Sequence, residues 1–307
     1  MSNNTAIKNV ILVGAAGNVG AGLVAPLASV YNITILTRES STSTFPEGIK
    51  VIRAAYTVDG LTEAFRGQDA VVSAVGGGGL VQQTVLIDAA VQAGVKRFLP
   101  SELSMSSTTA AFRELVPVFQ WKWEVLEYLK AKEKEGLSWT GIATGPFIDW
   151  GLNAGFLGFD IPNQKAKIWD GGKGVFSAIT VADMGKAVVG ALKNPEATKN
   201  KYIFAYSVTT SQTEILAELE KATAQKWQVE SVTSADDIEE GRKLVAAGDF
   251  VGMYKLVQAA TFGGLPGLGQ NFERDEKDGV ANDVLGIKPT SIEDIVAEVI
   301  GSTERRE

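Results

Sequence analysis

Short apolar runs alternate with amphipathic stretches through the first half of the chain. The apolar runs predict strands at 10–13, 32–37, 50–52, 69–79, 95–102 and 137–145, the fourth running into a glycine loop and the fifth stopped by Pro100. Helical spacing predicts helices over 23–30, 59–67, 80–94 and from Pro117 to Gly136. The strands lack in–out alternation, which is typical of a parallel sheet covered on both faces. We therefore predict an α/β fold with a doubly wound, parallel, Rossmann-like sheet.

After about residue 150 this rhythm loosens, and turns and aromatic residues appear. A strand end and a helix are predicted over 177–194, and further helices over 211–225, 235–247, 249–260 and 290–301. We predict a Rossmann domain over 1–150, to which segments near 175–205 return. A smaller α+β substrate-binding region is predicted to occupy mainly 151–307.

Composition excludes several classes of partner. The 307 residues are 45% hydrophobic and 21% charged, as in a globular protein. The net charge is −7 and no long basic run occurs, so we expect no nucleic-acid partner. No apolar run is long enough to cross a bilayer, the N-terminus lacks the pattern of a secretory signal, and cysteine is absent. We expect a cytoplasmic protein with no membrane partner.

The chain also contains no histidine. This removes the commonest general base and the commonest transition-metal ligand, so no metal site is predicted. Any acid–base chemistry must use Lys, Asp, Glu, Tyr or water.

The segment "GAAGNVG" stands where the first strand passes into the first helix. Gly14 would permit the tight turn, Gly17 would admit a pyrophosphate, and Gly20 would let the helix pack closely. Asn18 and Val19 complete this turn. The alternative is a tight structural turn, but the strand and amphipathic helix on either side are the context that a dinucleotide site requires.

The second strand ends in "LTR", where an NAD site usually carries an acidic residue. Here Thr37 and Arg38 occupy that place. An arginine suits the 2′-phosphate of NADP(H), so we predict NADP(H) as the cofactor, the alternative being a solvated surface arginine.

The chain contains two further glycine clusters. "SAVGGGG" at 73–79 ends the fourth strand at the same sheet edge, where Ala74, Val75 and Gly76 would contact the inner ribose and nicotinamide. The alternative for this cluster is a flexible connection to the next helix. "GGLPGLG" at 263–269 follows a helical pattern but leads into no clear helix, so we predict a loop there.

Lys122 lies between two tryptophans in "FQWKWEVLEYLK". It shares a helix face with apolar residues at Val118, Val125, Leu126 and Leu129, a face expected to point into the protein. A lysine there either extends its head to water or has a functional task. Burial near Trp121 and Trp123 would lower its pKa and a nearby Glu102 would raise it, and the sequence does not decide between them.

Together "GAAGNVG", "LTR", "SAVGGGG", "AGVKRFLPSE", the following lysine and "TGPFIDWG" resemble the NmrA-like, isoflavone reductase-like branch of atypical short-chain dehydrogenases. The resemblance covers nearly the whole chain, and "GLSWTGIATGPFIDWGL" has a fungal style. It implies an NADPH-binding Rossmann domain with a smaller substrate domain, and it places the family's catalytic lysine on Lys122. Val118 stands where ordinary short-chain dehydrogenases have a tyrosine. The family's "PSEFG" reads "PSELS" here, with Leu103 and Ser104.

The resemblance implies an NADPH-dependent reductase of a small aromatic or polycyclic metabolite, acting as a monomer or homodimer. Catalytic candidates are Lys122, Glu102 and Asp149, and candidates for the substrate pocket are Leu103, Phe147, Trp150 and Phe156, although ordinary core packing is the alternative for the aromatic residues. Two other functions stay open. One is a non-redox cyclase or isomerase that retains NADP, and the other is an NADP-sensing regulator, a branch that tends to lack the lysine.

Overall fold

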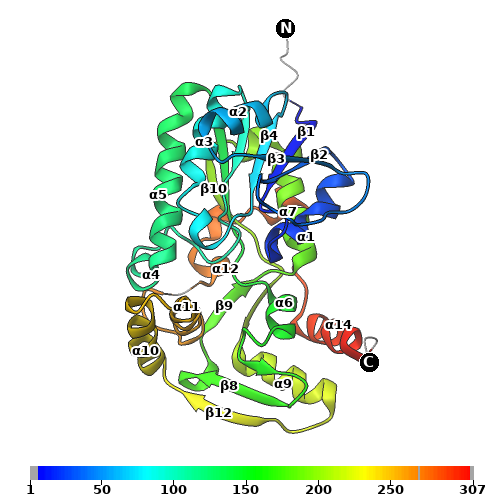
Figure 1. Ribbon diagram of the computed structural model, residues 1–307. Helices are drawn as coiled ribbons and strands as arrows, with labels where there is room; N and C mark the ends of the chain where they lie inside the picture. Colours follow the sequence, from blue (N-terminus) through cyan, green and yellow to red (C-terminus); the bar gives the residue numbers. More distant parts are fainter. Residues whose placement is uncertain (1–5, 269, 305–307) are drawn as a thin grey trace.

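A computed structural model describes residues 6–268 and 270–304 of the chain. Its main element is a seven-stranded parallel sheet with the order β10-β6-β5-β4-β1-β2-β3 (Figure 1). The strands are β1 (Asn9–Val13), β2 (Asn32–Arg38), β3 (Lys50–Ala54), β4 (Ala70–Ser73), β5 (Arg97–Leu99), β6 (Ser138–Ala143) and β10 (Lys201–Phe204). The doubly wound Rossmann-like fold is confirmed.

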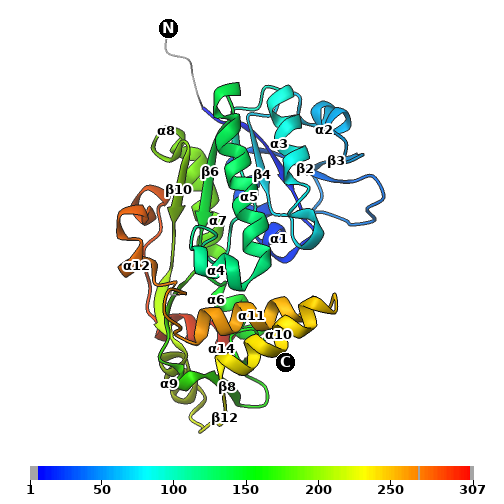
Figure 2. The ribbon, with the colours of Figure 1, turned by 90° about the vertical axis from the view of Figure 1, so that its left-hand side faces the viewer.

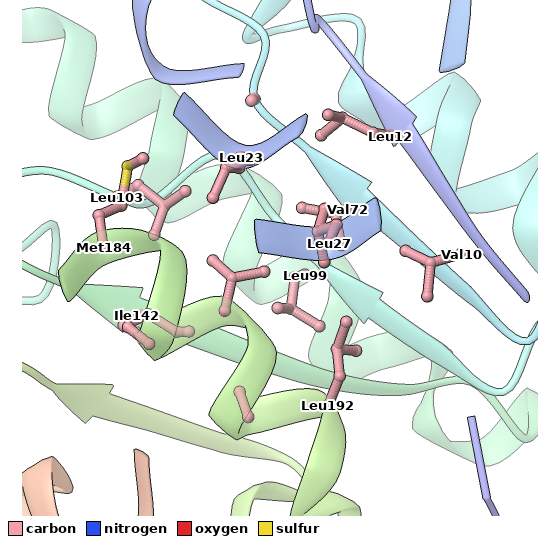
Figure 3. Close-up of a cluster of buried hydrophobic side chains, with 14 of the residues drawn as sticks. Val10, Leu12, Leu23, Leu27, Val72, Leu99, Leu103, Ile142, Met184 and Leu192 are labelled. Atoms are coloured by element: carbon pink, nitrogen blue, oxygen red, sulfur yellow. The ribbon is translucent and has the colours of Figure 1, made fainter. Parts of the chain in front are cut away.

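Helices cover both faces of this sheet. One face packs against α1 (Asn18–Ala28) and α7 (Val181–Lys193), and the other against α2 (Val58–Phe65), α3 (Gln83–Gln92) and α5 (Pro117–Lys132). Successive residues of β1 enter opposite cores, Val10 and Leu12 on the α1 side and Ile11 and Val13 on the α5 side. Figure 3 shows the first core, where Leu23 and Leu27 of α1 meet side chains of the sheet and of α7. A strand buried on both faces has no polar face, which explains the continuous apolar runs.

The strand order reverses beside β1. The strand β2 lies on one side of β1 and β4 on the other, both parallel to it. The loops that follow β1 and β4 therefore diverge at the carboxyl edge of the sheet, the place where folds of this class bind ligands.

Buried Arg97 ties the sheet together at the opposite, amino edge, where β4, β5 and β6 begin. Its guanidinium donates to the hydroxyls of Ser138 at 2.9 Å, Thr140 at 2.9 Å and Thr198 at 3.1 Å, and to the carbonyl oxygen of Pro195 at 2.7 Å. Arg97 belongs to the "VKRFLPSE" motif, so part of that motif has a structural role.

Most of the remaining chain forms a smaller layer beyond the carboxyl ends of the main strands (Figures 1 and 2). It contains a three-stranded sheet with the order β12-β8-β7 and a two-stranded pair of β11 and β9. The strands are β7 (Phe159–Asp160), β8 (Lys165–Trp169), β9 (Val175–Ala178), β11 (Val208–Ser211) and β12 (Gln228–Val232). The chain returns from this layer to the main sheet through α7 and β10.

The helices predicted in the second half are present. They are α9 (Gln212–Thr223), α10 (Ser234–Ala246), α11 (Val251–Phe262) and α14 (Ile292–Glu304). The shorter helices α4 (Ala110–Leu115), α6 (Ile148–Asn153), α8 (Pro195–Thr198), α12 (Phe272–Asp275) and α13 (Asn282–Leu285) were not predicted. Each of these five spans two turns or fewer, too short for a periodic pattern to develop. The domain boundary near residue 150 stays a prediction.

Candidate cofactor and active site

The turn after β1 is built on close backbone contacts. Gly14 has a φ of +88°, and a Cβ there would lie 2.6 Å from the carbonyl oxygen of Ala74. A Cβ on Gly20 would lie 2.2 Å from the carbonyl oxygen of Gly14. At Gly17 the nearest atom would be 3.5 Å away, so this glycine faces open space. Gly17 is the N-cap of α1 and supplies no side-chain cap, and the first amides of a helix lack intrahelical partners, which suits an anion.

A cleft of about 490 Å³ opens in front of this turn, and we call it the glycine cleft. It is lined by Gly14, Ala15, Ala16, Gly17, Leu36, Thr37, Arg38, Ser41, Ser43, Tyr56, Ala74, Val75, Gly76, Gly78, Gly79 and Gln82. The structure thus brings together the predicted residues of three separate loops. Gly20 lies behind the turn, where it lets α1 approach Gly14.

Arg38 lies exposed at one end of the glycine cleft, beside Tyr56. Burial raises the pKa of the Tyr56 hydroxyl, and the positive charge of Arg38 opposes that rise. Within the described parts of the chain, no carboxylate forms an ion pair with Arg38, so its guanidinium is available to an anionic ligand. Tyr56 carried no sequence signal, since it lies on the loop after the third strand, outside any motif.

A second cavity, of about 360 Å³, continues from the first, and we call it the Lys122 pocket. The two cavities share Gly17, Ala74, Val75 and Gly76. The rest of its lining is Asn18, Val19, Gly77, Leu80, Ser101, Leu103, Ser104, Met105, Val118, Phe119, Lys122, Phe147, Phe156, Phe250, Met253, Tyr254 and Val257. One continuous groove therefore leads from Arg38 to Lys122. The four residues from 250–257 were not predicted, because the apolar spacing around α11 is also that of an ordinary core helix.

Lys122 is buried, with 8% of its surface exposed. Its Nζ donates to the carbonyl oxygen of Glu102 at 2.8 Å and to Oγ of Ser104 at 2.6 Å. Burial lowers the pKa of Lys122 to about 8, and the negative charge of Glu102 opposes that shift. Burial therefore outweighs the carboxylate, which the sequence left undecided.

The aromatic ring that approaches Lys122 differs from the expected one. The Phe119 ring centroid lies 5.3 Å from Nζ of Lys122. Trp123 instead holds the guanidinium of Arg113 at 4.3 Å and Nζ of Lys130 at 4.8 Å from its ring centroid. Neighbours in sequence on a helix point in different directions, so position 119 is better placed than position 123.

Glu102 has its carboxylate behind the pocket. Oε2 accepts hydrogen bonds from Ser107 and from Tyr202, both at 2.8 Å. Burial raises the pKa of Glu102, opposed by the charge of Lys122 and by these two hydrogen bonds. The carbonyl oxygen of Glu102, not its carboxylate, contacts Lys122, so direct acid–base work on a ligand in the pocket is not supported by this geometry.

Asp149 also lies away from the pocket lining. Its two carboxylate oxygens each accept the amide of Val181 at 3.1 Å, and Oδ1 accepts the amide of Trp150 at 2.8 Å. Val181 is the first residue of α7, so this carboxylate holds a helix start. Burial raises the pKa of Asp149, and the hydrogen bonds from the amides of Trp150 and Val181 oppose that rise. The geometry supports a structural role for Asp149.

The predicted aromatic residues divide between pocket and core. Phe147 and Phe156 line the Lys122 pocket together with Leu103. Trp150 lies behind them, with its ring centroid 6.1 Å from that of Phe156. Phe159, a further aromatic residue of the same segment that was not among the named candidates, is fully buried in the core of the smaller layer.

The other glycine loop lines a different and larger cavity, of about 670 Å³. Residues 263–267 form one wall, and Lys173, Arg274, Asp275 and Glu276 contribute charges. Arg274 is paired with Asp275, with Nε and Oδ1 2.6 Å apart. This cavity shares no lining residue with the glycine cleft. Residues 263–268 form a loop, as predicted, and Gly269 lies outside the described residues. The short helix α12 begins soon after the loop, at Phe272, and was not predicted.

The NmrA-like family profile matches residues 6–265, and the chain belongs to this family. Oxidoreductase aprR of Aspergillus flavus is 37% identical over 95% of this chain and 98% of its own length. Oxidoreductase poxI of Penicillium oxalicum is 34% identical over 93% and 92%. The predicted family and its fungal character are confirmed, and both relatives carry the name of the predicted enzyme class.

A solved structure of AtPrR2 with NADP+ and (+)-pinoresinol has the same fold. The TM-score is 0.73 at 22% identity, over 96% of this chain and 99% of that one. In the described part of this chain, no helix has the length and apolar character needed to span a membrane. The same residues contain no cluster of three side chains suited to a metal ion.

Proposed function

We propose that this protein is an NADPH-dependent reductase of a small aromatic or polycyclic metabolite, with Lys122 in its active site. The observation that carries the proposal is the continuous groove that joins the glycine turn to the buried lysine. Fungal relatives named oxidoreductases and a structural neighbour solved with NADP+ support it.

The residues of the glycine cleft fit a dinucleotide. The open face at Gly17 and the free amides of α1 suit a pyrophosphate. Arg38 suits a 2′-phosphate, because no carboxylate among the described residues neutralises it. Ala74, Val75 and Gly76 belong to both cavities and so would carry the ribose and nicotinamide end toward Lys122. When bound, NADPH supplies a hydride.

The Lys122 pocket suits an apolar substrate with one electronegative atom. Leu103, Phe147, Phe156 and Met253 provide apolar walls, and among the described residues no carboxylate side chain lines the pocket. Lys122, with a pKa of about 8, is mostly protonated at pH 7 and can stabilise negative charge that develops on a carbonyl oxygen or an imine nitrogen.

The test measures NADPH consumption at 340 nm with three acceptors: an aryl enone (trans-chalcone), a quinone (menadione) and a cyclic aryl imine (3,4-dihydroisoquinoline). A reductase consumes NADPH in step with product formation. A cyclase or isomerase would form product from a suitable precursor at constant absorbance. A regulatory sensor would bind oxidised and reduced cofactor with similar affinity and convert nothing, and that pattern would overturn the proposal.

A further inference from the structure

Ser104 occupies a fixed position beside Lys122. Its carbonyl oxygen accepts the amides of Thr144 at 2.9 Å and Gly145 at 3.1 Å, just beyond the end of β6. This holds the Ser104 backbone against the main sheet. Ser104 and Lys122 both line the Lys122 pocket, so a ligand there can reach either side chain.

The Ser104 hydroxyl and the Lys122 ammonium share one acceptor. Lys122 donates to Oγ of Ser104 at 2.6 Å, and both groups donate to the carbonyl oxygen of Glu102, at 2.8 Å from Nζ and 2.6 Å from Oγ. A serine hydroxyl rotates to suit its partners. If the Ser104 hydrogen turns toward a ligand, the Glu102 carbonyl keeps its bond from Lys122 and no buried acceptor is left unpaired.

The other side chains near Lys122 are poor proton donors to a ligand in the pocket. Val118 lines the pocket one helical turn before Lys122 and has no transferable proton. Tyr254 also lines it, but half of Tyr254 is exposed, which favours hydrogen bonds to water. The Ser104 hydroxyl is the side-chain group that both contacts Nζ of Lys122 and faces the pocket.

We infer that Ser104 is a catalytic residue that passes a proton from Lys122 to the substrate, an assignment that rests on the proposed reductase function. Bound NADPH would supply the hydride for an electrophilic carbon of the substrate, and the electron pair of the reduced double bond would move to its electronegative atom. Oγ of Ser104 gives its proton to that atom while Nζ of Lys122 gives a proton to Oγ. Lys122 then regains a proton from water. The sum consumes one hydride and one solvent proton, which balances the reduction.

The test compares Ser104→Ala with the parent on the acceptor that the parent reduces fastest. We expect kcat to fall about tenfold or more, since a positioned proton donor contributes on the order of a hundredfold or more and direct donation by Lys122 replaces part of it. The dissociation constant of NADPH should change less than about twofold, because the glycine cleft is untouched. Ser104→Thr, which restores a hydroxyl, should recover most of the loss.

The matched control is Ser106→Ala, which removes a hydroxyl from the same loop outside both cavities and should leave kcat unchanged. If the parent is active and Ser104→Ala has full activity, the proton role of Ser104 is wrong and the reductase function still stands. A parent that oxidises NADPH with none of the three acceptors overturns the reductase function and this proton route with it.

A second measurement separates proton transfer from mere placement of Lys122. In mixtures of H2O and D2O, kcat of the parent should follow a curved dependence on deuterium fraction, because two protons move together. The residual kcat of Ser104→Ala should follow a straight line, because one proton moves. The same curvature in both proteins would mean that Ser104 only positions Lys122, and the inference would be wrong.

Discussion

A Cβ atom on Gly20 would lie 2.2 Å from the carbonyl oxygen of Gly14, whereas a Cβ on Gly17 would meet its nearest atom at 3.5 Å. These two glycines of one motif therefore have different structural roles. Gly20 permits backbone contact between α1 and the turn, and Gly17 keeps space open in front of it.

This difference predicts opposite results for two substitutions. Gly17→Val should fold, with native circular dichroism, and should lose NADPH binding because its branched side chain fills the cleft. Gly20→Ala should lower the melting temperature or prevent folding, because its Cβ would force the backbone of Gly14 and Ala15 to move. Unchanged NADPH affinity in a folded Gly17→Val protein would place the pyrophosphate elsewhere.

Arg38 is predicted to set the choice of cofactor. Arg38→Ala should weaken NADPH binding by about tenfold or more and NADH binding much less, because it removes a charge-assisted contact to the 2′-phosphate alone. Fluorescence titration gives both dissociation constants. Arg66→Ala is the matched control, since Arg66 is also exposed but pairs with Glu63 and lines neither cavity. Equal losses for both cofactors would remove Arg38 from the site.

Lys122→Met tests the lysine itself. The substitution keeps the apolar stem and deletes the ammonium. Turnover should fall by about a hundredfold or more. The melting temperature should fall modestly, because buried Glu102 loses a neighbouring positive charge while the desolvation cost of the ammonium is removed. The Glu102 carbonyl keeps the hydrogen bond from Ser104, so no acceptor is orphaned. Full turnover in this variant would leave Lys122 as a packing residue.

The lowered pKa of Lys122 makes a separate prediction about stability. Its folded-state pKa of about 8 lies below the ordinary value of 10.5. Between those two pH values the unfolded chain binds more protons than the folded one, so the free energy of unfolding should rise with pH across that window. Urea unfolding of the parent, minus that of Lys122→Met, should show a rise on the order of 3 kcal/mol at most between pH 8 and 10.5. A flat difference would contradict the assigned burial of the charge.

Asp149→Ala is expected to affect stability and not binding. The variant removes the acceptor for the amides of Val181 and Trp150, and loss of such a group at a helix start costs about 1 kcal/mol. NADPH affinity and turnover should match the parent in the folded protein. Asp149→Asn, which keeps one oxygen, should be intermediate in stability. A selective loss of turnover in Asp149→Asn would restore the acid–base role.

Local patterns were sufficient for the sheet and the cofactor turn because each depends on neighbours in sequence. The apolar run from Val10 to Val13 predicts a buried strand, and the glycines at 14, 17 and 20 predict a turn between a strand and a helix. The contact between Ser104 and Lys122 depends instead on the path of the backbone after β5, which no short motif encodes. The same holds for Phe250 and Tyr254, which reach the pocket only because α11 folds back toward the main sheet.

The return of α7 and β10 to the main sheet has a consequence for biosynthesis. When residue 150 has just emerged from the ribosome, β6 has no neighbouring strand on the side that β10 later occupies. The core beneath α1 also lacks the side chains of α7. Those elements follow only after β7, β8 and β9 have been made. The sheet therefore cannot close around its hydrophobic core until about two-thirds of the polypeptide has emerged. A fragment that ends near residue 150 would expose that core to water, because it lacks α7 and β10.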